Sequence, residues 1–232
     1  MKKRLVAILT LGNLSESNAW NKLVKLTRHK HTLLSMSAFH SLIKIDPNGS
    51  MLELGHLIID RQDWPIFSMI KLLSEESPLT SCEKLKSIAH HYSDEQLVHI
   101  LQYFEQLKCF GTSNIIHRIL NESHNDSLIC RALAALNDPT AIHFAFEFID
   151  HEKWYVRVQA VNAIGRLGTA KEVPYLVARL SDPEWWVRYR AARAIVKMPF
   201  VDTNELKKLY EYVTDKYAID MLNHVVAEKD TR

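Results

Sequence analysis

Cationic and aromatic residues recur at helical spacing in the C-terminal half of the chain. Spacings of four, three and four positions would place one row of side chains on a single helix face: Trp186, Arg190, Arg193 and Lys197. Between residues 152 and 201 there are nine Lys or Arg against four Asp or Glu, a local net charge of +5. Such a row could bind an acidic peptide, a phosphate-bearing ligand or nucleic acid. Alternatively, the cations are solvated and the Arg stems pack across Trp rings.

A second row lies 31 residues upstream and contains Tyr155, Gln159, Asn162 and Arg166. The two rows supply seven candidate partner-binding residues: Gln159, Asn162, Arg166, Trp186, Arg190, Arg193 and Lys197. A fainter third row is interrupted by Ala134 and Asp138. Because a nucleic-acid groove needs positive charge along its length, we expect a protein, with an acidic peptide or surface, rather than nucleic acid as the partner.

Other chemistries find little support in the sequence. His143, Glu147 and His151 lie at i, i+4 and i+8, but zinc sites need tighter, convergent motifs, and His151 is expected in the turn after its helix. The sequence contains no Ser elbow, P-loop or Gly-rich dinucleotide turn. We therefore expect no metal and no other cofactor, name no catalytic residue, and favour a binding protein over an enzyme.

Both rows belong to a segment that repeats. Residues of the same or a similar type recur at an offset of 31 residues: Trp154 and Trp185, Val156 and Val187, Arg157 and Arg188, Ala160 and Ala191, Ala163 and Ala194, Ile164 and Ile195. A fainter copy spans residues 128–136, at an offset of 28. Self-similarity at a fixed period predicts stacked repeats, in which each helix pair buries its apolar face against its neighbour.

The repeated positions predict a tightly packed seam between helices. Val187, Ala191, Ala194 and Ile195 form one apolar face at the helical period, and the small Ala side chains allow close approach. Asp182, like Asp150 before it, precedes a helix and can cap its N-terminus, while its carboxylate can meet an Arg of its own or the next repeat. The Trp154-Tyr155 and Trp185-Trp186 pairs at the helix starts favour packing between repeats.

These residues resemble the HEAT repeat family in its short bacterial form, the HEAT-like repeats of phycobilisome lyases. The resemblance rests on two sets of residues, Asp150, Val156, Arg157, Ala160, Ala163, Ile164 and Gly168, and then Asp182, Pro183, Val187, Arg188, Ala191, Ala192 and Ile195. It implies an all-α, right-handed α-solenoid of stacked antiparallel helix pairs, whose second helices line a concave binding face. It implies no reaction.

Helical periodicity continues weakly through the rest of the chain. We expect one array over residues 1–232, with about seven to eight repeats, the clearest at 126–200 and a C-terminal cap at 202–232. Within it, residues 139–149 and 171–180 are expected to form whole helices. Residues 2–14 are expected to open the array as a helix; the run after Lys2-Lys3-Arg4 vaguely resembles a signal peptide but is broken by Gly12 and Asn13.

Composition is that of an ordinary folded chain of 232 residues, with a net charge of +2. Three cysteines, Cys82, Cys109 and Cys130, show no CxxC spacing. Their odd number favours buried, free thiols in a reducing compartment, and hence a cytoplasmic protein. No window approaches 18 consecutive apolar residues, so no membrane span is expected.

The leading functional hypothesis is a non-catalytic scaffold or adaptor that binds another protein along the concave face. Three alternatives remain. Two are enzymes built on similar helices, a bilin lyase-like subunit and a HEAT-like DNA glycosylase. The third is a nucleic-acid-binding module that uses the basic stripe at 157–197.

Overall fold

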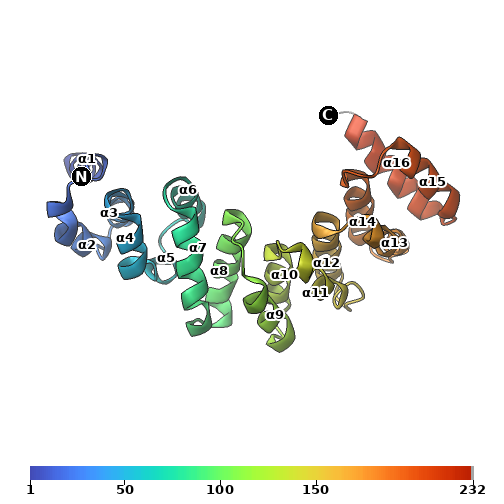
Figure 1. Cartoon of the computed structure of the whole chain (residues 1–232), viewed down its shortest axis with the longest axis horizontal. Helices are drawn as coiled ribbons and strands as arrows, with labels where there is room; N and C mark the ends of the chain where they lie inside the picture. Colours follow the sequence, from blue (N-terminus) through green and yellow to red (C-terminus); the bar gives the residue numbers. More distant parts are fainter. Residues whose placement is uncertain (231–232) are drawn as a thin grey trace. The chain divides into compact units, whose positions relative to one another are not determined.

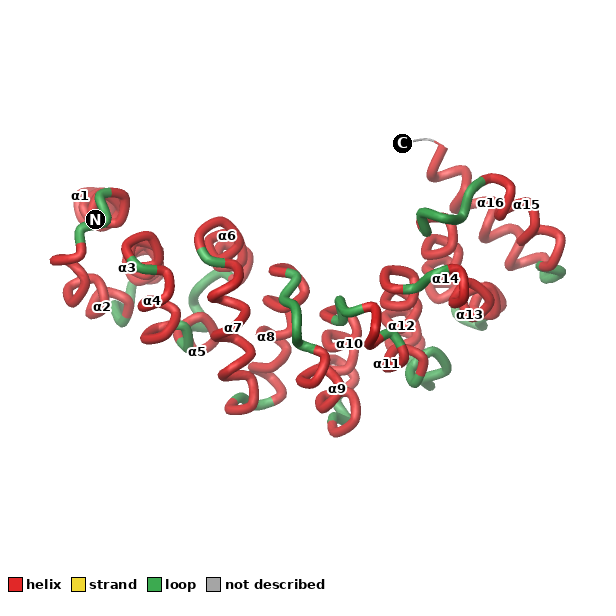
Figure 2. Tube along the Cα trace, viewed as in Figure 1, coloured by secondary structure: helices red, strands yellow, loops and turns green. Residues whose placement is uncertain are grey.

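The computed structural model describes residues 1–230, with only the backbone described at positions 203, 229 and 230. Within this part of the chain every regular element is a helix, and Figure 2 shows helices joined by short loops without a strand. The all-α class expected from the sequence is confirmed. The handedness of a solenoid and the number of repeats stay predictions.

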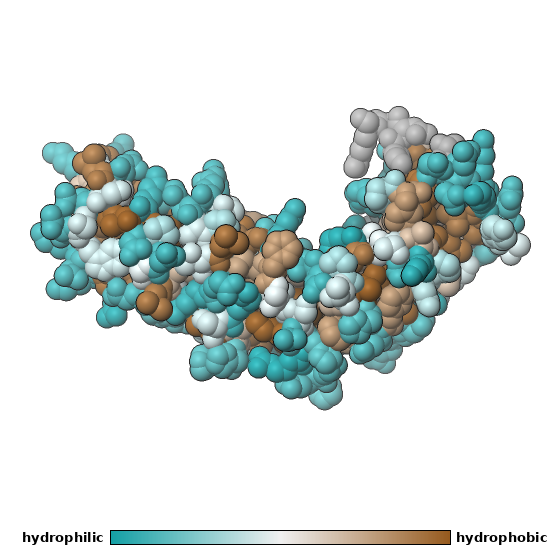
Figure 3. Space-filling model, viewed as in Figure 1, coloured by the Kyte–Doolittle hydropathy of each residue, from teal (hydrophilic) through white to brown (hydrophobic). Residues whose placement is uncertain are grey.

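The chain forms two compact units, residues 1–109 and 110–232. The single array expected over residues 1–232 stays a prediction. Among residues 1–230, no helix is both long and apolar enough to cross a bilayer. On the face shown in Figure 3, hydrophilic residues cover most of each unit, with apolar residues interspersed.

The first unit contains eight α-helices in its described residues (Figure 1): α1 (Lys2–Asn13), α2 (Trp20–Thr27), α3 (Thr32–Ile45), α4 (Pro47–Leu54), α5 (Leu57–Asp60), α6 (Ile66–Glu76), α7 (Pro78–Ile88) and α8 (Asp94–Leu107). Two short 3-10 helices, η1 (Ser17–Ala19) and η2 (Ala89–His91), adjoin α2 and α7. The helix α1 packs on α3, where Ser41 donates a hydrogen bond of 2.8 Å to the Ile8 carbonyl. The expected opening helix is therefore confirmed.

Arg61 and Trp64 connect helices of the first unit. The Arg61 guanidinium donates to the Thr27 carbonyl at 2.6 Å and to Asp63 at 2.6 Å. The bond to Thr27 holds the loop after α5 against the end of α2, and the bond to Asp63 lies within the loop. The hydrogen bond from Arg61 lowers the pKa of Asp63 strongly. Trp64 is buried against Phe39, with ring centroids 5.1 Å apart.

Cys82 of α7 and Cys109, just after α8, form a disulfide with Cα atoms 5.4 Å apart. This overturns the expectation of three free thiols, and with it the argument for a reducing compartment. The sequence did not reveal the pair because 27 residues separate the two cysteines, and only the packing of α7 against α8 brings them together. Cys130 is a free, half-buried thiol, and burial raises its pKa to about 11.

The second unit contains the remaining α-helices of the described residues: α9 (Ser113–Glu122), α10 (Asp126–Ala135), α11 (His143–Phe146), α12 (Trp154–Leu167), α13 (Val173–Ala178), α14 (Trp185–Lys197), α15 (Thr203–Tyr212) and α16 (Lys216–Asp230). Three 3-10 helices lie between them: η3 (Pro139–Ala141), η4 (Ala170–Glu172) and η5 (Arg179–Ser181). Along this unit α10, α12, α14 and α16 each pack against the next (Figure 1).

The helices expected at 139–149 and 171–180 are shorter than predicted. Each begins as a 3-10 turn and holds only a short α-helix, α11 or α13. Pro174 explains the late start of α13, because a residue without an N–H cannot donate to the carbonyl four positions earlier. Thr169 and Glu172 instead close a capping box around η4.

The seam between α12 and α14 is the centre of the second unit. Three equivalent positions of the two helices are fully buried: Val156, Ala160 and Ile164 on α12, and Val187, Ala191 and Ile195 on α14. The predicted apolar face is therefore confirmed at these positions, but Ala194 is only half-buried and lies at the edge of the seam. The helix expected after Asp202 is α15, and Asp202 accepts hydrogen bonds from the backbone of Asn204 and Glu205. The cap expected at 202–232 stays a prediction. Its residues 231 and 232 lie outside the described residues.

Candidate partner-binding site

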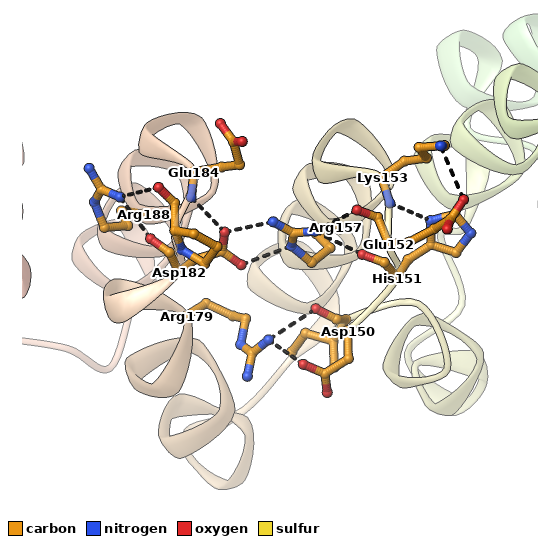
Figure 4. A network of polar contacts seen from close by, with 11 residues as sticks. Asp150, His151, Glu152, Lys153, Arg157, Arg179, Asp182, Glu184 and Arg188 are labelled. Atoms are coloured by element: carbon orange, nitrogen blue, oxygen red, sulfur yellow. Dashed lines mark hydrogen bonds and ion pairs between the residues drawn. The ribbon is translucent and has the colours of Figure 1, made fainter.

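A buried ion pair fixes α12 relative to α14. The Arg157 guanidinium donates two hydrogen bonds of 2.8 Å to the Asp182 carboxylate (Figure 4). The same carboxylate accepts the backbone N–H of Glu184 at 2.9 Å, next to the first turn of α14. Asp182 therefore holds Glu184, the residue at the N-cap of α14, although α14 has no side-chain cap. Its Arg partner belongs to the preceding repeat, whereas the sequence favoured its own or the next one. The hydrogen bonds with Asp182 raise the pKa of Arg157.

Each repeat also uses its Arg to hold its own entry loop. Arg157 donates to the carbonyls of His151 and Glu152, at 2.8 and 3.1 Å. Arg188 repeats this arrangement on the carbonyls of Asp182 and Pro183, at 2.7 and 2.9 Å (Figure 4). Recurrence of the same contacts in both copies explains why a Val-Arg pair is repeated at this position.

Asp150 does not cap α12, contrary to the sequence expectation. Its carboxylate is largely exposed and pairs with Arg179 of the following repeat. The upstream copy has one residue more between Asp and Trp than the downstream copy. This extra residue moves Asp150 away from the helix start, and α12 begins without a side-chain cap.

The two helices approach each other closely at Gly165 and Ala194. A Cβ placed on Gly165 would lie 2.4 Å from the Ala194 Cβ, so only glycine fits there without movement. This contact brings the outward rows of α12 and α14 side by side.

Between these rows lies a hollow of about 440 Å³, called the basic hollow below. It is lined by Asn162, Gly165, Arg166, Arg190, Arg193, Ala194, Lys197 and Pro199. Five of the seven candidate residues therefore surround one space. Gln159, half-buried, and Trp186, exposed, lie outside the lining. Sequence reasoning missed Gly165 and Pro199, although a glycine inside a helix is a known signal of close backbone approach.

The basic hollow has four cationic side chains and no carboxylate in its lining. Arg166 is held in place, because its Nη2 donates to the carbonyls of Leu133, Ala134 and Leu136 at 3.2, 3.1 and 2.7 Å. Among the side chains that the structure describes, no carboxylate forms an ion pair with Arg190, Arg193 or Lys197. Like charges without counterions repel one another, so an anion bound in this space would be stabilised.

Aromatic rings extend the row toward the N-terminus of α14. Trp185 and Trp186 are 42% and 49% exposed, and Trp185 stacks on Tyr189 with centroids 5.1 Å apart. Trp154 and Tyr155 contact each other at the start of α12, and Tyr155 donates to Asp126 of α10 at 2.7 Å. The sequence predicted that these rings pack between repeats, but apart from this one hydrogen bond they do not. They form exposed apolar surface.

Residues 122–222 match the family model for HEAT repeats. No curated protein matches the chain. The matched HEAT segment contains α10 to α15, the whole basic hollow and the Arg157–Asp182 pair. This segment includes residues 126–200, where the sequence resembles HEAT repeats most clearly, and it extends into the expected cap at 202–232. The resemblance is weaker there in the sequence, because α15 and α16 lack the Trp-Val-Arg signature.

The HEAT segment also contains the histidines considered as metal ligands. The ring of His143 lies within hydrogen-bonding distance of the Thr140 carbonyl, and that of His151 accepts the Lys153 N–H at 3.2 Å. Among the described side chains, no group of three or more His, Cys, Asp or Glu is placed to hold a metal ion.

Proposed function

We propose that the chain is a non-catalytic scaffold or adaptor that binds another protein through the outward rows of α12 and α14. The observation that carries the proposal is the basic hollow, where three cations have no carboxylate partner among the described side chains and share α14 with two exposed tryptophans. Arg and Trp are the residue types that most often dominate binding energy, because they bury a large area while presenting a directed polar group. HEAT repeats, matched over residues 122–222, commonly serve as protein-interaction scaffolds.

We include in this proposal the right-handed solenoid of about seven to eight repeats, with the hollow on its concave face. A likeness to the repeats of phycobilisome lyases is also part of it. The bilin lyase-like, glycosylase and nucleic-acid-binding alternatives gain no specific support from the geometry. The positive row ends at Ala134 and Asp138, and Asp138 accepts a hydrogen bond from Ser113. A continuous nucleic-acid track would not be expected to contain a carboxylate there.

Affinity capture from extracts of the cells that make the protein tests this function. Replacing Arg190 and Arg193 by Glu should leave the melting temperature nearly unchanged, because neither side chain forms an ion pair among the described residues. The same replacement should weaken capture of the protein that the unaltered chain retains. The matched control is Lys207→Glu with Lys216→Glu, two exposed positions of the same unit that change the net charge equally. If the control weakens capture as much as the test variant, the binding surface lies elsewhere.

A further inference from the structure

The basic hollow adjoins a second hollow of opposite character. This apolar hollow, of about 450 Å³, is lined by Arg193, Val196, Lys197, Met198, Pro199, Val201, Asp202, Val225 and Glu228. Arg193, Lys197 and Pro199 line both spaces, so the two meet at the C-terminal end of α14. A ligand that fills both must therefore carry an anionic group next to an apolar one.

The charge of the basic hollow favours a doubly charged anion. Arg190, Arg193 and Lys197 have no carboxylate partner among the described side chains, and Arg166 is fixed at the edge by three carbonyls. One carboxylate would neutralise one of these charges. A phosphate monoester carries about −1.5 to −2 at pH 7 and offers three strong acceptor oxygens to arginine forks.

The apolar hollow disfavours a polyanion. Asp202 and Glu228 lie in its lining, so their carboxylates would face a second phosphate placed in this hollow. These carboxylates and a phosphate carry like charges and would repel each other. Val196, Met198, Val201 and Val225 instead present apolar surface that suits an aliphatic side chain. A polypeptide can place a phosphate and an aliphatic group on neighbouring residues, whereas a nucleic-acid strand repeats its phosphates.

We propose that the two hollows together bind a phosphorylated segment of a partner protein, with the phosphate of a phosphoserine or phosphothreonine in the basic hollow and an adjacent aliphatic side chain in the apolar one. This proposal rests on the proposed scaffold function and names the chemistry of its partner. Arg193 and Lys197 bridge the two parts of the site and position the phosphate relative to the aliphatic group.

Fluorescence anisotropy with labelled nonapeptides tests the proposal directly. The probe carries one phosphoserine followed by leucine in a Gly-Ser background. Its controls are the same peptide with serine, the same with glutamate, and the phosphopeptide with aspartate in place of leucine. The phosphoserine-leucine peptide should bind at least about tenfold more tightly than each control, as expected for charge-assisted bidentate contacts. Equal binding of the serine or glutamate peptide would overturn the phosphate assignment. Tighter binding of an oligothymidine of similar length would favour the nucleic-acid reading instead.

Two substitutions test whether the phosphopeptide binds at these two hollows. Arg193→Gln and Lys197→Gln should each reduce the affinity for the phosphopeptide toward that of the serine peptide. Lys207→Gln, at an exposed position on α15, is the matched control and should have no effect. Lys197 is exposed, so its replacement tests the site even where Arg193→Gln lowers the melting temperature. Unchanged affinity in both folded variants would place phosphate binding elsewhere.

Phosphatase treatment of the extract separates this inference from the scaffold function. Capture that is lost in the Arg190 and Arg193 charge reversal and also after phosphatase treatment supports both. Capture that is lost on charge reversal but survives phosphatase treatment leaves the scaffold function standing and refutes the phosphorylated partner. Capture that survives both treatments refutes both.

Discussion

Arg157 and Asp182 join two consecutive repeats through a bidentate ion pair, with both hydrogen bonds at 2.8 Å and the side chains only 10% and 2% exposed. Asp182 also accepts the Glu184 N–H, so its carboxylate serves the seam and the start of α14 at once. A charge buried in this way is costly when it loses its partner. The stability of the HEAT segment should therefore depend strongly on this pair.

We predict that Asp182→Ala lowers the free energy of unfolding by about 3–5 kcal/mol, because it leaves the Arg157 guanidinium buried and unpaired. Urea denaturation of single and double variants measures the coupling. Asp182 and Arg157 should couple by about 1–3 kcal/mol in a double-mutant cycle. Arg188 supplies the control, because it contacts only the Asp182 backbone and should show no coupling with that carboxylate. Equal coupling to both arginines would contradict the assignment.

The seam itself should resist larger side chains. Ala160→Leu and Ala191→Leu, at two fully buried positions, should each lower the free energy of unfolding by about 1–3 kcal/mol through overpacking. Ala170→Leu, at an exposed position in η4, should change it little. Denaturation midpoints give the comparison, and equal midpoints for all three variants would place α12 and α14 in a different register.

Two opposing physical effects determine how Gly165→Ala changes stability. Alanine is the better helix former by about 1 kcal/mol, which alone would stabilise α12. The new methyl group, however, would lie 2.4 Å from the Ala194 Cβ, so the helices must separate. We expect net destabilisation, and partial recovery when Ala194→Gly is added. Thermal melts of both variants provide the measurement; a more stable single variant would show that the seam accommodates the methyl group.

The disulfide should stabilise the first unit. Replacing Cys82 and Cys109 by Ser should lower the free energy of unfolding by about 2–4 kcal/mol, because the link restricts the unfolded chain between them. Cys130→Ser, which breaks no disulfide, is the control. Thiol titration of the unreduced, denatured protein should find one reactive cysteine. Finding three would contradict the pairing.

Patterns along one helix were predictable from the sequence, whereas contacts between helices were not. The 31-residue offset identified the buried faces of α12 and α14, since burial at 3.6-residue spacing needs no knowledge of the neighbour. It also placed Asn162, Arg166, Arg190, Arg193 and Lys197 on outward rows. The repeat of Asp and Arg could not reveal which repeat supplies the partner, because that depends on the path of the loop between them.

Three further features could not be predicted from the sequence pattern. Trp185 and Trp186 were expected between repeats, but their rings contact one another and Tyr189 on the same helix. Arg166 was expected to face outward, and its guanidinium also binds the end of α10. The Cys82–Cys109 link requires α7 and the end of α8 to meet. None of these contacts leaves a periodic signal.

Because Asp182 shares its carboxylate between its own helix start and the arginine of the preceding copy, the loop before α14 is a poor place to recombine the protein. A hybrid that joined foreign sequence between Arg157 and Asp182 would inherit half of the pair from each parent. Arg157 and Asp182 would then each lie in a junction whose geometry suits a different partner residue. The piece of this segment that could be transferred intact is therefore the interface between the two copies, from the entry loop of α12 to the seam of α14, rather than either copy alone.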